Sequence, residues 1–127
     1  MEKRIYYHDT DCGGVVYYAN YLKFLEEART EFLEKRGILI KELLKQNIIF
    51  VVSRQEIEYK FPAFYSDILS IDTRIARLYP VRMEFDYEIK NKSGKIICLA
   101  KTILACVDSD FKPRAIPGII REKLTDP

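Results

Sequence analysis

One segment of this chain has the spacing of a long amphipathic helix, and the patterns that follow it are mostly those of strands. Over residues 19–36, apolar residues recur at steps of three and four, which places them on one stripe of an α-helix. That stripe consists of Leu22, Leu25, Ala28 and Phe32, widened by Phe24 and Leu33. Gly37 provides the expected C-terminal stop. A chain with one long helix has to bury the stripe against a sheet, which predicts an α+β layered domain.

Alternating apolar and polar residues predict antiparallel strands after residue 50. In residues 51–61 the apolar side chains stand at odd positions, namely Val51, Ile57, Tyr59 and Phe61. Residues 83–89 alternate cleanly, residues 69–75 continue the pattern, and residues 91–94 (Asn-Lys-Ser-Gly) are typical of a hairpin turn. We also expect a first strand at 4–7, a loop at 8–14, and short helices near 40–46 and 117–124.

The segment 95–107 differs from the other strands because both of its faces are apolar. One face holds Ile96, Cys98, Ala100 and Leu104, and the other holds Ile97, Leu99, Ile103 and Ala105. The helix covers one side of a small sheet, so the other side needs a second chain or the C-terminal segment. This pattern indicates a homo-oligomer built from a single domain over residues 1–127.

Charge and cysteine content exclude several classes of protein. The 21 basic and 19 acidic residues give a net charge of +2 and are interleaved, which does not indicate a nucleic-acid partner. Cysteines at 12, 98 and 106 have no CxxC spacing, so we expect neither a disulfide framework nor a metal site, and no cofactor. Reduced thiols, the absence of an apolar N-terminal segment and the lack of a run of about 20 apolar residues predict a soluble cytoplasmic protein without membrane insertion.

The segment 8–21 carries the groups with chemical potential. Asp9 and Asp11 lie in a loop with Gly13 and Gly14 that leads into the helix. Free N–H groups at a helix start attract developing negative charge and can polarise a carbonyl, while a carboxylate beside them can activate water or attack directly. The structural alternative is that both carboxylates form Asx-turns or cap the helix.

A resemblance to a known family covers this segment and extends over nearly the whole chain. The run Asp9-Thr-Asp-Cys-Gly-Gly-Val-Val-Tyr-Tyr-Ala-Asn-Tyr-Leu22, followed by Glu27-Ala-Arg29, resembles the signature of the 4-hydroxybenzoyl-CoA thioesterase family, in particular the tol-pal-associated acyl-CoA thioesterases. The similarity also includes Tyr65-Ser-Asp67, Cys106-Val-Asp108 and Pro113-Arg114. It implies a hot-dog fold, in which an antiparallel sheet wraps one long central α-helix, and homodimers or homotetramers with the active site at the subunit interface.

The resemblance also implies an activity, hydrolysis of acyl-CoA to a free acid and CoA, and a role for each matching residue. Asp11 corresponds to the catalytic nucleophile or general base, the backbone N–H of Tyr18 to the group that polarises the thioester carbonyl, and Asp9 to a supporting residue. The expected substrate-binding residues are Gly14, Val15, Tyr17 and Arg82. Arg82 is expected to meet the CoA phosphates, with Arg77 and Arg114 as weaker candidates.

One position departs from the subgroup. The tol-pal enzymes usually have His where this chain has Tyr18, whereas the 4-hydroxybenzoyl-CoA enzymes resemble this chain there. A backbone N–H serves with either side chain. We rank lower a Cys12 nucleophile with His8 as its base, because the neighbouring Asp residues oppose thiolate formation.

Aromatic residues have two interpretations. Tyr17, Tyr18, Tyr21 and Phe24, like Tyr59, Phe61, Phe64 and Tyr65, either line an acyl pocket or form core and dimer contacts. Three alternative functions also stay open: an acyl-carrier-protein thioesterase, a dehydratase or hydratase of the same fold, and a non-catalytic acyl-CoA-binding or scaffold protein.

Overall fold

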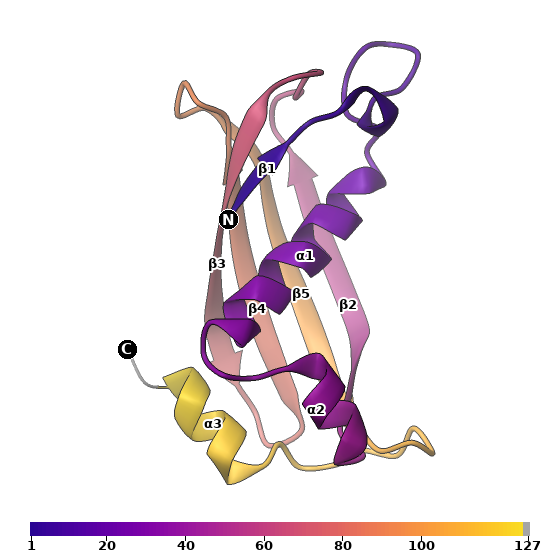
Figure 1. Cartoon of the computed structure of the whole chain (residues 1–127), viewed down its shortest axis with the longest axis vertical. Helices are drawn as coiled ribbons and strands as arrows, with labels where there is room; N and C mark the ends of the chain where they lie inside the picture. Colours follow the sequence, from indigo (N-terminus) through magenta and orange to yellow (C-terminus); the bar gives the residue numbers. More distant parts are fainter. Residues whose placement is uncertain (126–127) are drawn as a thin grey trace.

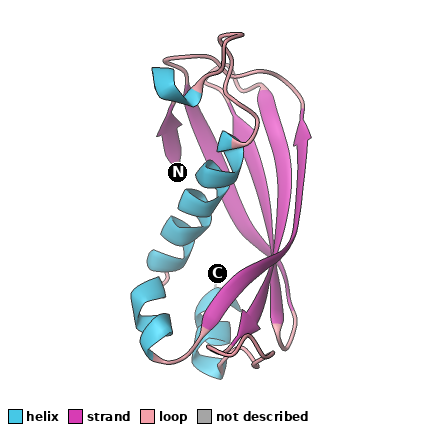
Figure 2. Cartoon of the chain, turned by 90° about the vertical axis from the view of Figure 1, so that its right-hand side faces the viewer, coloured by secondary structure: helices cyan, strands magenta, loops and turns pink. Residues whose placement is uncertain are grey.

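A single long helix, α1 (Asn20–Glu34), lies against one face of a curled five-stranded antiparallel sheet (Figures 1 and 2). The computed structural model describes residues 1–125. The strand order is β1-β3-β4-β5-β2. The strands are β1 (Glu2–Arg4), β2 (Ile49–Tyr59), β3 (Ile68–Leu78), β4 (Arg82–Lys90) and β5 (Ile96–Val107). This arrangement confirms the predicted α+β hot-dog fold.

The two short helices lie at one end of the sheet, where α1 also ends (Figure 1). They are α2 (Ile40–Lys45) and α3 (Gly118–Thr125), which confirms the helices expected near 40–46 and 117–124. The N-terminal end of α1 and the loop that precedes it lie at the opposite end of the sheet (Figure 1). The fold therefore separates the loop with the two carboxylates from both short helices.

The predicted end of α1 is confirmed. Gly37 adopts φ +76°, a left-handed conformation that favours glycine. The N–H of Gly37 donates to the Glu34 carbonyl at 3.0 Å, and the N–H of Ile38 donates to the Leu33 carbonyl at 2.9 Å. These bonds satisfy carbonyls that a helix end leaves free, and they turn the chain toward α2.

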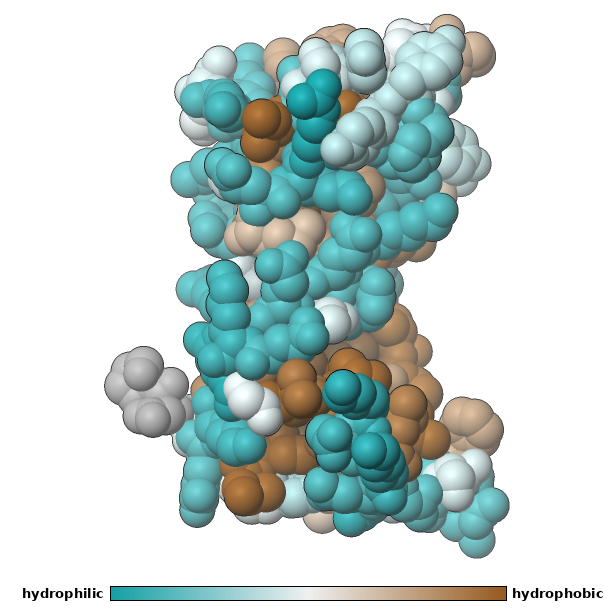
Figure 3. Space-filling model, viewed as in Figure 1, coloured by the Kyte–Doolittle hydropathy of each residue, from teal (hydrophilic) through white to brown (hydrophobic). Residues whose placement is uncertain are grey.

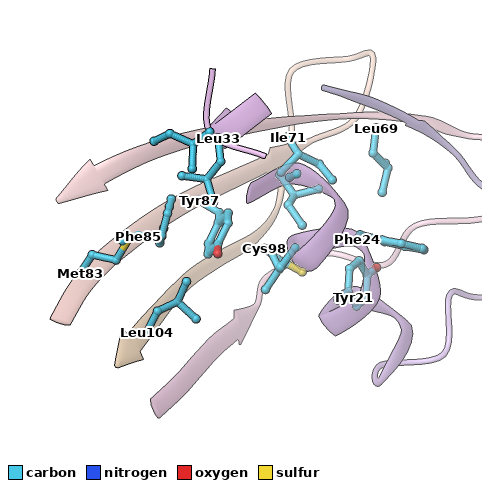
Figure 4. Close-up of a cluster of buried hydrophobic side chains, with 14 of the residues drawn as sticks. Tyr21, Phe24, Leu33, Leu69, Ile71, Met83, Phe85, Tyr87, Cys98 and Leu104 are labelled. Carbon is cyan, nitrogen blue, oxygen red and sulfur yellow. The ribbon is translucent and has the colours of Figure 1, made fainter. Parts of the chain in front are cut away.

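The core lies between α1 and the sheet (Figure 4). In β4 the predicted alternation is confirmed, because Met83, Phe85, Tyr87 and Ile89 are all buried while the acidic residues between them are not. The buried residues of α1 are Tyr21, Phe24, Leu25, Ala28 and Leu33.

Leu22 contradicts the predicted helix stripe. Its side chain is 46% exposed, whereas that of the adjacent Tyr21 is 3% exposed. Successive residues are about 100° apart around an α-helix, so a sheet that contacts Tyr21 leaves Leu22 to one side. At the N-terminal end of α1, the face that contacts the sheet is therefore displaced by one residue from the predicted apolar stripe.

The predicted faces of β2 are wrong before residue 54, because the strand contains a β-bulge between Val52 and Arg54. Val51 pairs with Ala105 and Val52 pairs with the buried Leu104, so by register Val52 and not Val51 lies on the same face as Leu104. At this sheet edge Val52 is nevertheless 50% exposed, whereas Val51 is half-buried. The extra residue, Ser53, restores the predicted parity for Ile57 and Tyr59.

The first strand begins earlier than predicted. β1 ends at Arg4, and a 3-10 turn occupies Tyr7–Asp9 instead of strand residues at 6–7. The cause is the carboxylate of Asp9, whose Oδ2 accepts a hydrogen bond from the N–H of Tyr6 at 2.9 Å. That N–H is then not available to a neighbouring strand.

The outer surface follows the sequence pattern. The face of α1 that points away from the sheet is mostly hydrophilic, whereas hydrophobic side chains gather below its C-terminal end, between α2 and α3 (Figure 3).

In β5, Leu99, Ile103 and Ala105 on the outer sheet face are only half-buried. Ile96 is 37% exposed, so at the beginning of that strand Ile97 and Cys98 are the buried residues. No helix within residues 1–125 is both long and apolar enough to cross a membrane.

Candidate active site

The loop before α1 is a tight hairpin that begins and ends with paired backbone. Thr10 and Val16 form an antiparallel bridge, and the N–H of Asp11 donates to the Val15 carbonyl at 2.9 Å. The N–H of Gly14 donates to the Asp11 carbonyl at 3.1 Å, and Gly14 has φ +82°. A type I turn followed by a left-handed glycine is a common three-residue hairpin loop. The loop places Asp11 at its tip.

The carboxylate of Asp11 is exposed and partly fixed in direction. Its Oδ1 accepts a hydrogen bond from the N–H of Gly13 at 2.8 Å. This Asx-turn is the structural role that the sequence left open. Among residues 1–125, Oδ2 of the same carboxylate accepts no hydrogen bond. One oxygen therefore holds the side chain in place while the other faces outward.

Asp9 has a structural position beneath the hairpin. It is 6% exposed, and its backbone carbonyl accepts hydrogen bonds from the N–H of Tyr17 and from Nδ2 of Asn20, both at 2.9 Å. The Asp9 carboxylate accepts from the Tyr6 N–H, so Asp9 links the end of β1, the hairpin and the start of α1. Its supporting role in catalysis stays a prediction.

The start of α1 presents a free amide. Within the described chain no acceptor is found for the backbone N–H of Tyr18, which lies two residues before the first residue of α1. Unpaired N–H groups at a helix N-terminus carry partial positive charge and attract oxyanions. The amide expected to polarise a thioester carbonyl is therefore available.

Aromatic side chains surround the hairpin and are largely exposed. Tyr17 is 45% exposed, and its ring centroid lies 4.9 Å from that of Tyr18. The pKa of Tyr17 is raised above its ordinary value, chiefly by the adjacent Tyr18 hydroxyl and least by the Asp11 carboxylate. Of the expected acyl-pocket residues, only Tyr21 and Phe24 belong to the core. Those that remain open to a ligand or a second chain are Tyr17, Tyr18, Tyr59, Phe64 and Tyr65.

Arg82 lies at the other end of the same subunit. It opens β4 beside Ala105, and its guanidinium Cζ stands 5.2 Å from the ring centroid of Tyr79. The preceding Pro80 carbonyl accepts from the N–H of Ile116, in the segment that leads to α3. The structure thus brings Gly14, Val15 and Tyr17 to the hairpin with Asp11 but does not bring Arg82 there within one chain.

The two weaker arginine candidates already have partners. Nη1 of Arg114 donates to the carbonyls of Gln46 and Asn47 at 2.7 and 2.8 Å, which ties the end of α2 to the C-terminal segment. The hydroxyl of Tyr79 beside Arg77 raises the pKa of that guanidinium. Both arginines are therefore engaged in contacts within the chain.

Cys12 and His8 do not lie together as a nucleophile and its base. Cys12 is exposed at the hairpin tip, and among residues 1–125 no hydrogen bond links it to His8. His8 lies 3.8 Å from Oδ1 of Asp9, with an 81% exposed side chain. Cys98 and Cys106 are buried, as predicted for small core residues.

A hollow of about 710 Å³ lies elsewhere, across the middle of β2, β5, β4 and β3. Charged side chains line it, and some of them are paired: Asp86 lies 3.4 Å from Nζ of Lys101 and 3.2 Å from Arg74. All of its lining residues belong to strands, so no helix N-terminus supplies an oxyanion donor there. The hairpin remains the candidate site.

The sequence interpretation missed two hydrogen bonds at the site. Asn20 donates from its side chain to the Asp9 carbonyl, and the hydroxyl of Tyr59 donates to the Tyr18 carbonyl at 3.2 Å. The Asn20 bond spans 11 residues and is not the local N-cap bond that Asn at a helix start is known for, so it was not accessible from sequence. Nor was the Tyr59 bond, because its partner is 41 residues away in the chain.

Comparisons with known proteins place the chain in a family. Residues 6–124 match the model of the thioesterase-like superfamily. The acyl-CoA thioester hydrolase YbgC of Escherichia coli O6:H1 is 39% identical over 118 residues, covering 92% of this chain and 88% of that protein. The acyl-CoA thioesterase YbgC of Helicobacter pylori J99 is 34% identical, covering 98% of each chain.

Solved structures show the same fold. A hypothetical protein from Aquifex aeolicus superposes with a TM-score of 0.93 at 27% identity, covering 98% of both chains. A DHNA-CoA thioesterase from Staphylococcus aureus superposes with a TM-score of 0.87 at 32% identity, covering 91% of this chain and 78% of that one.

Proposed function

The chain belongs to the thioesterase-like superfamily, and we propose that it hydrolyses acyl-CoA thioesters with the carboxylate of Asp11 and the backbone N–H of Tyr18. One observation carries the proposal. A carboxylate fixed through Oδ1 by the Gly13 N–H, with Oδ2 free, precedes a helix start at which the Tyr18 N–H is also free. A nucleophile or base and an oxyanion donor are the two groups that acyl transfer needs.

The Tyr18 N–H would donate to the thioester oxygen as negative charge develops on it. Removing one such donor in other enzymes costs about 10²- to 10³-fold in kcat. The free Oδ2 of Asp11 then has two routes. It attacks the carbonyl carbon, the C–S bond breaks, and CoA leaves as a thiolate that takes a proton from solvent. The resulting mixed anhydride is hydrolysed by water.

In the second route Oδ2 removes a proton from water as that water attacks the carbonyl carbon. Collapse of the tetrahedral intermediate expels the CoA thiolate, which then takes the proton. A single turnover in ¹⁸O-water tests for the anhydride. Attack of water on its Asp11 carbonyl labels the protein and leaves the acid product unlabelled, which general-base catalysis cannot do. Trapping the anhydride with hydroxylamine distinguishes the routes when only the product is labelled, since general-base catalysis and attack of water on the acyl carbonyl both label the acid.

A second copy of the chain would complete the site. Within residues 1–125, the long edge strand β2 pairs only with β5, and Val52 on it is 50% exposed. Antiparallel pairing of two β2 strands joins two sheets and places the Ile49 end of one strand beside the Tyr59 end of the other. Arg82 of one subunit is then near the end of the sheet that carries Asp11 of the other, where a CoA phosphate can extend.

The proposal is tested by measuring thiol release from short-chain, long-chain and aromatic acyl-CoAs, with matched acyl-carrier-protein thioesters beside them. Turnover of at least one CoA ester is expected, and the preferred acyl group identifies the substrate class. Turnover of carrier-protein thioesters alone would replace CoA as the thiol partner. Tight acyl-CoA binding without any turnover would contradict an enzymatic function.

A further inference from the structure

We propose that Asn20 is a positioning residue that, together with Tyr59, holds the Tyr18 amide in the direction required for catalysis. This inference rests on the proposed function of that amide. Neither residue is expected to touch the reacting atoms. The Asn20 side chain acts through its hydrogen bond to the Asp9 carbonyl, and the Tyr59 hydroxyl acts through its hydrogen bond to the Tyr18 carbonyl.

The peptide unit that contains the Tyr18 N–H is held by the start of α1. Its carbonyl is that of Tyr17, which accepts a hydrogen bond from the backbone N–H of Asn20 at 2.9 Å. A peptide unit is planar, with its N–H and C=O pointing in opposite directions. Holding the Tyr17 carbonyl toward α1 therefore directs the Tyr18 N–H away from the helix, toward solvent and a bound thioester.

A side-chain hydrogen bond connects the start of α1 with the hairpin that carries Asp11. Nδ2 of Asn20 donates to the carbonyl of Asp9, which also accepts the N–H of Tyr17. Asp9 is buried and precedes the Thr10–Val16 bridge at the base of the hairpin that carries Asp11. The Asn20 side chain thus ties the start of α1 to the stem of the Asp11 hairpin and sets the separation of the two catalytic groups.

The peptide unit that follows the Tyr18 Cα is held by a residue of β2. The hydroxyl of Tyr59 donates to the Tyr18 carbonyl at 3.2 Å, and the two rings meet edge to face with centroids 6.3 Å apart. Both peptide planes that flank the Tyr18 Cα are consequently held, one by the backbone N–H of Asn20 and one by the Tyr59 hydroxyl at the end of β2. The Asn20 side chain anchors the first of these to the Asp11 hairpin through Asp9. A donor fixed in this way needs little reorganisation when the oxyanion forms.

The test compares Asn20→Ala and Tyr59→Phe with the native protein. A misplacement of about 1 Å can cost about 10²-fold in rate, so we expect kcat to fall about 10-fold or more in Asn20→Ala. KM should change much less than kcat, because the hydrogen bond from the amide strengthens as negative charge develops on the thioester oxygen in the transition state. Tyr59→Phe should show a smaller change in the same direction.

A spectroscopic measurement separates positioning from mere stabilisation. In an Asp11→Asn background the thioester is expected to stay intact, so the C=O stretching frequency of bound acyl-CoA reports its polarisation. We expect a downshift on binding to Asp11→Asn and a smaller downshift in Asp11→Asn/Asn20→Ala. Lys123→Met, which removes a side-chain bond to the Gly37 carbonyl at the far end, should leave the downshift unchanged in the same background.

The outcomes are distinct. An equal downshift with and without Asn20, or an unchanged kcat in Asn20→Ala, would overturn the positioning role while leaving the proposed function intact. No downshift in Asp11→Asn itself, with bound acyl-CoA, would instead contradict the role of the Tyr18 amide on which the inference rests.

Discussion

At the scale of single residues, Gly14 shows how backbone conformation supports the chemistry. It closes the hairpin at φ +82°, and a Cβ added there would meet no atom within 4 Å. Substitution is therefore limited by backbone strain alone, which is about 1–2 kcal/mol for an L-residue in this region. The hydrogen bonds that aim Asp11 depend on that conformation.

We predict that Gly14→Ala lowers the free energy of unfolding by about 1–2 kcal/mol and also lowers turnover. Gly118→Ala is the matched control, because a Cβ there also meets open space but the residue has no left-handed φ. Urea unfolding and thiol release measure the two effects. A Gly14→Ala protein as stable and active as the Gly118→Ala protein would contradict the assignment of strain.

Buried weak acids predict the response to alkaline pH. Burial raises the pKa of the Cys98 thiol to about 12 and also raises that of the Tyr21 hydroxyl. Above about pH 9 the unfolded chain loses the thiol proton while the folded chain keeps it, so stability falls as pH rises, until the folded pKa is reached. The loss is at most about 1.4 kcal/mol per pH unit for each group.

Cys98→Ala should therefore show a shallower decline of the unfolding free energy between about pH 9 and about pH 11 than the native protein. Cys12→Ser, at an exposed thiol, should keep the native slope. Urea unfolding over this range measures both. Identical slopes in all three proteins would show that ionisation of Cys98 is not coupled to unfolding.

Residue-level roles were only partly predictable. The Asp-rich, glycine-bearing loop indicated a carboxylate at a helix start, and the structure confirms that location. The free amide at Tyr18 followed from the general property of helix termini. The hydrogen bond from Tyr59 to the Tyr18 carbonyl was not predictable, because a contact between β2 and the start of α1 has no local sequence signal.

At the scale of elements, arginines that look alike in sequence differ in what they hold. Arg114 closes the end of α2 through two backbone carbonyls, whereas Arg82 is exposed and contacts only the Tyr79 ring among the described interactions of residues 1–125. We predict that Arg114→Met destabilises the fold by about 1–2 kcal/mol without changing KM.

Arg82→Met should do the reverse. It should raise KM for acyl-CoA several-fold, because a phosphate contact is lost, and leave the unfolding free energy within about 0.5 kcal/mol of native. Paired unfolding curves and Michaelis plots compare the two variants. An unchanged KM in Arg82→Met would remove this residue from the CoA site.

Periodicity predicted the elements better than their exact faces. The α1 boundaries, the hairpin at 91–94 and the alternation of β4 are confirmed because they depend on neighbours in the chain. The bulge in β2 and the exposure of Leu22 depend on how the sheet curls around the helix. Such features arise only when the layers pack.

At the scale of the whole molecule, the edge strand β2 and the flank of α1 leave apolar side chains uncovered. Leu22 and Val52 are about half exposed. We predict that the native protein is an oligomer in which these residues are covered, and that Leu22→Glu/Val52→Lys shifts it toward monomer and lowers turnover.

Light scattering coupled to gel filtration measures the mass of each form. Ile119→Lys, at a 63% exposed residue on α3, is the control and should keep the native mass and turnover. A native monomer with full activity, or a double variant of native mass, would contradict pairing through β2.

The central claim is that Asp11 performs the chemistry, and turnover of the preferred acyl-CoA by Asp11→Asn tests it most directly. The amide cannot serve as carboxylate nucleophile or base, yet its oxygen can still accept the Gly13 N–H, so the hairpin should persist. We predict a loss of at least about 10²-fold in kcat with unchanged mass and unfolding free energy. Native turnover in a correctly folded Asp11→Asn protein would contradict the account.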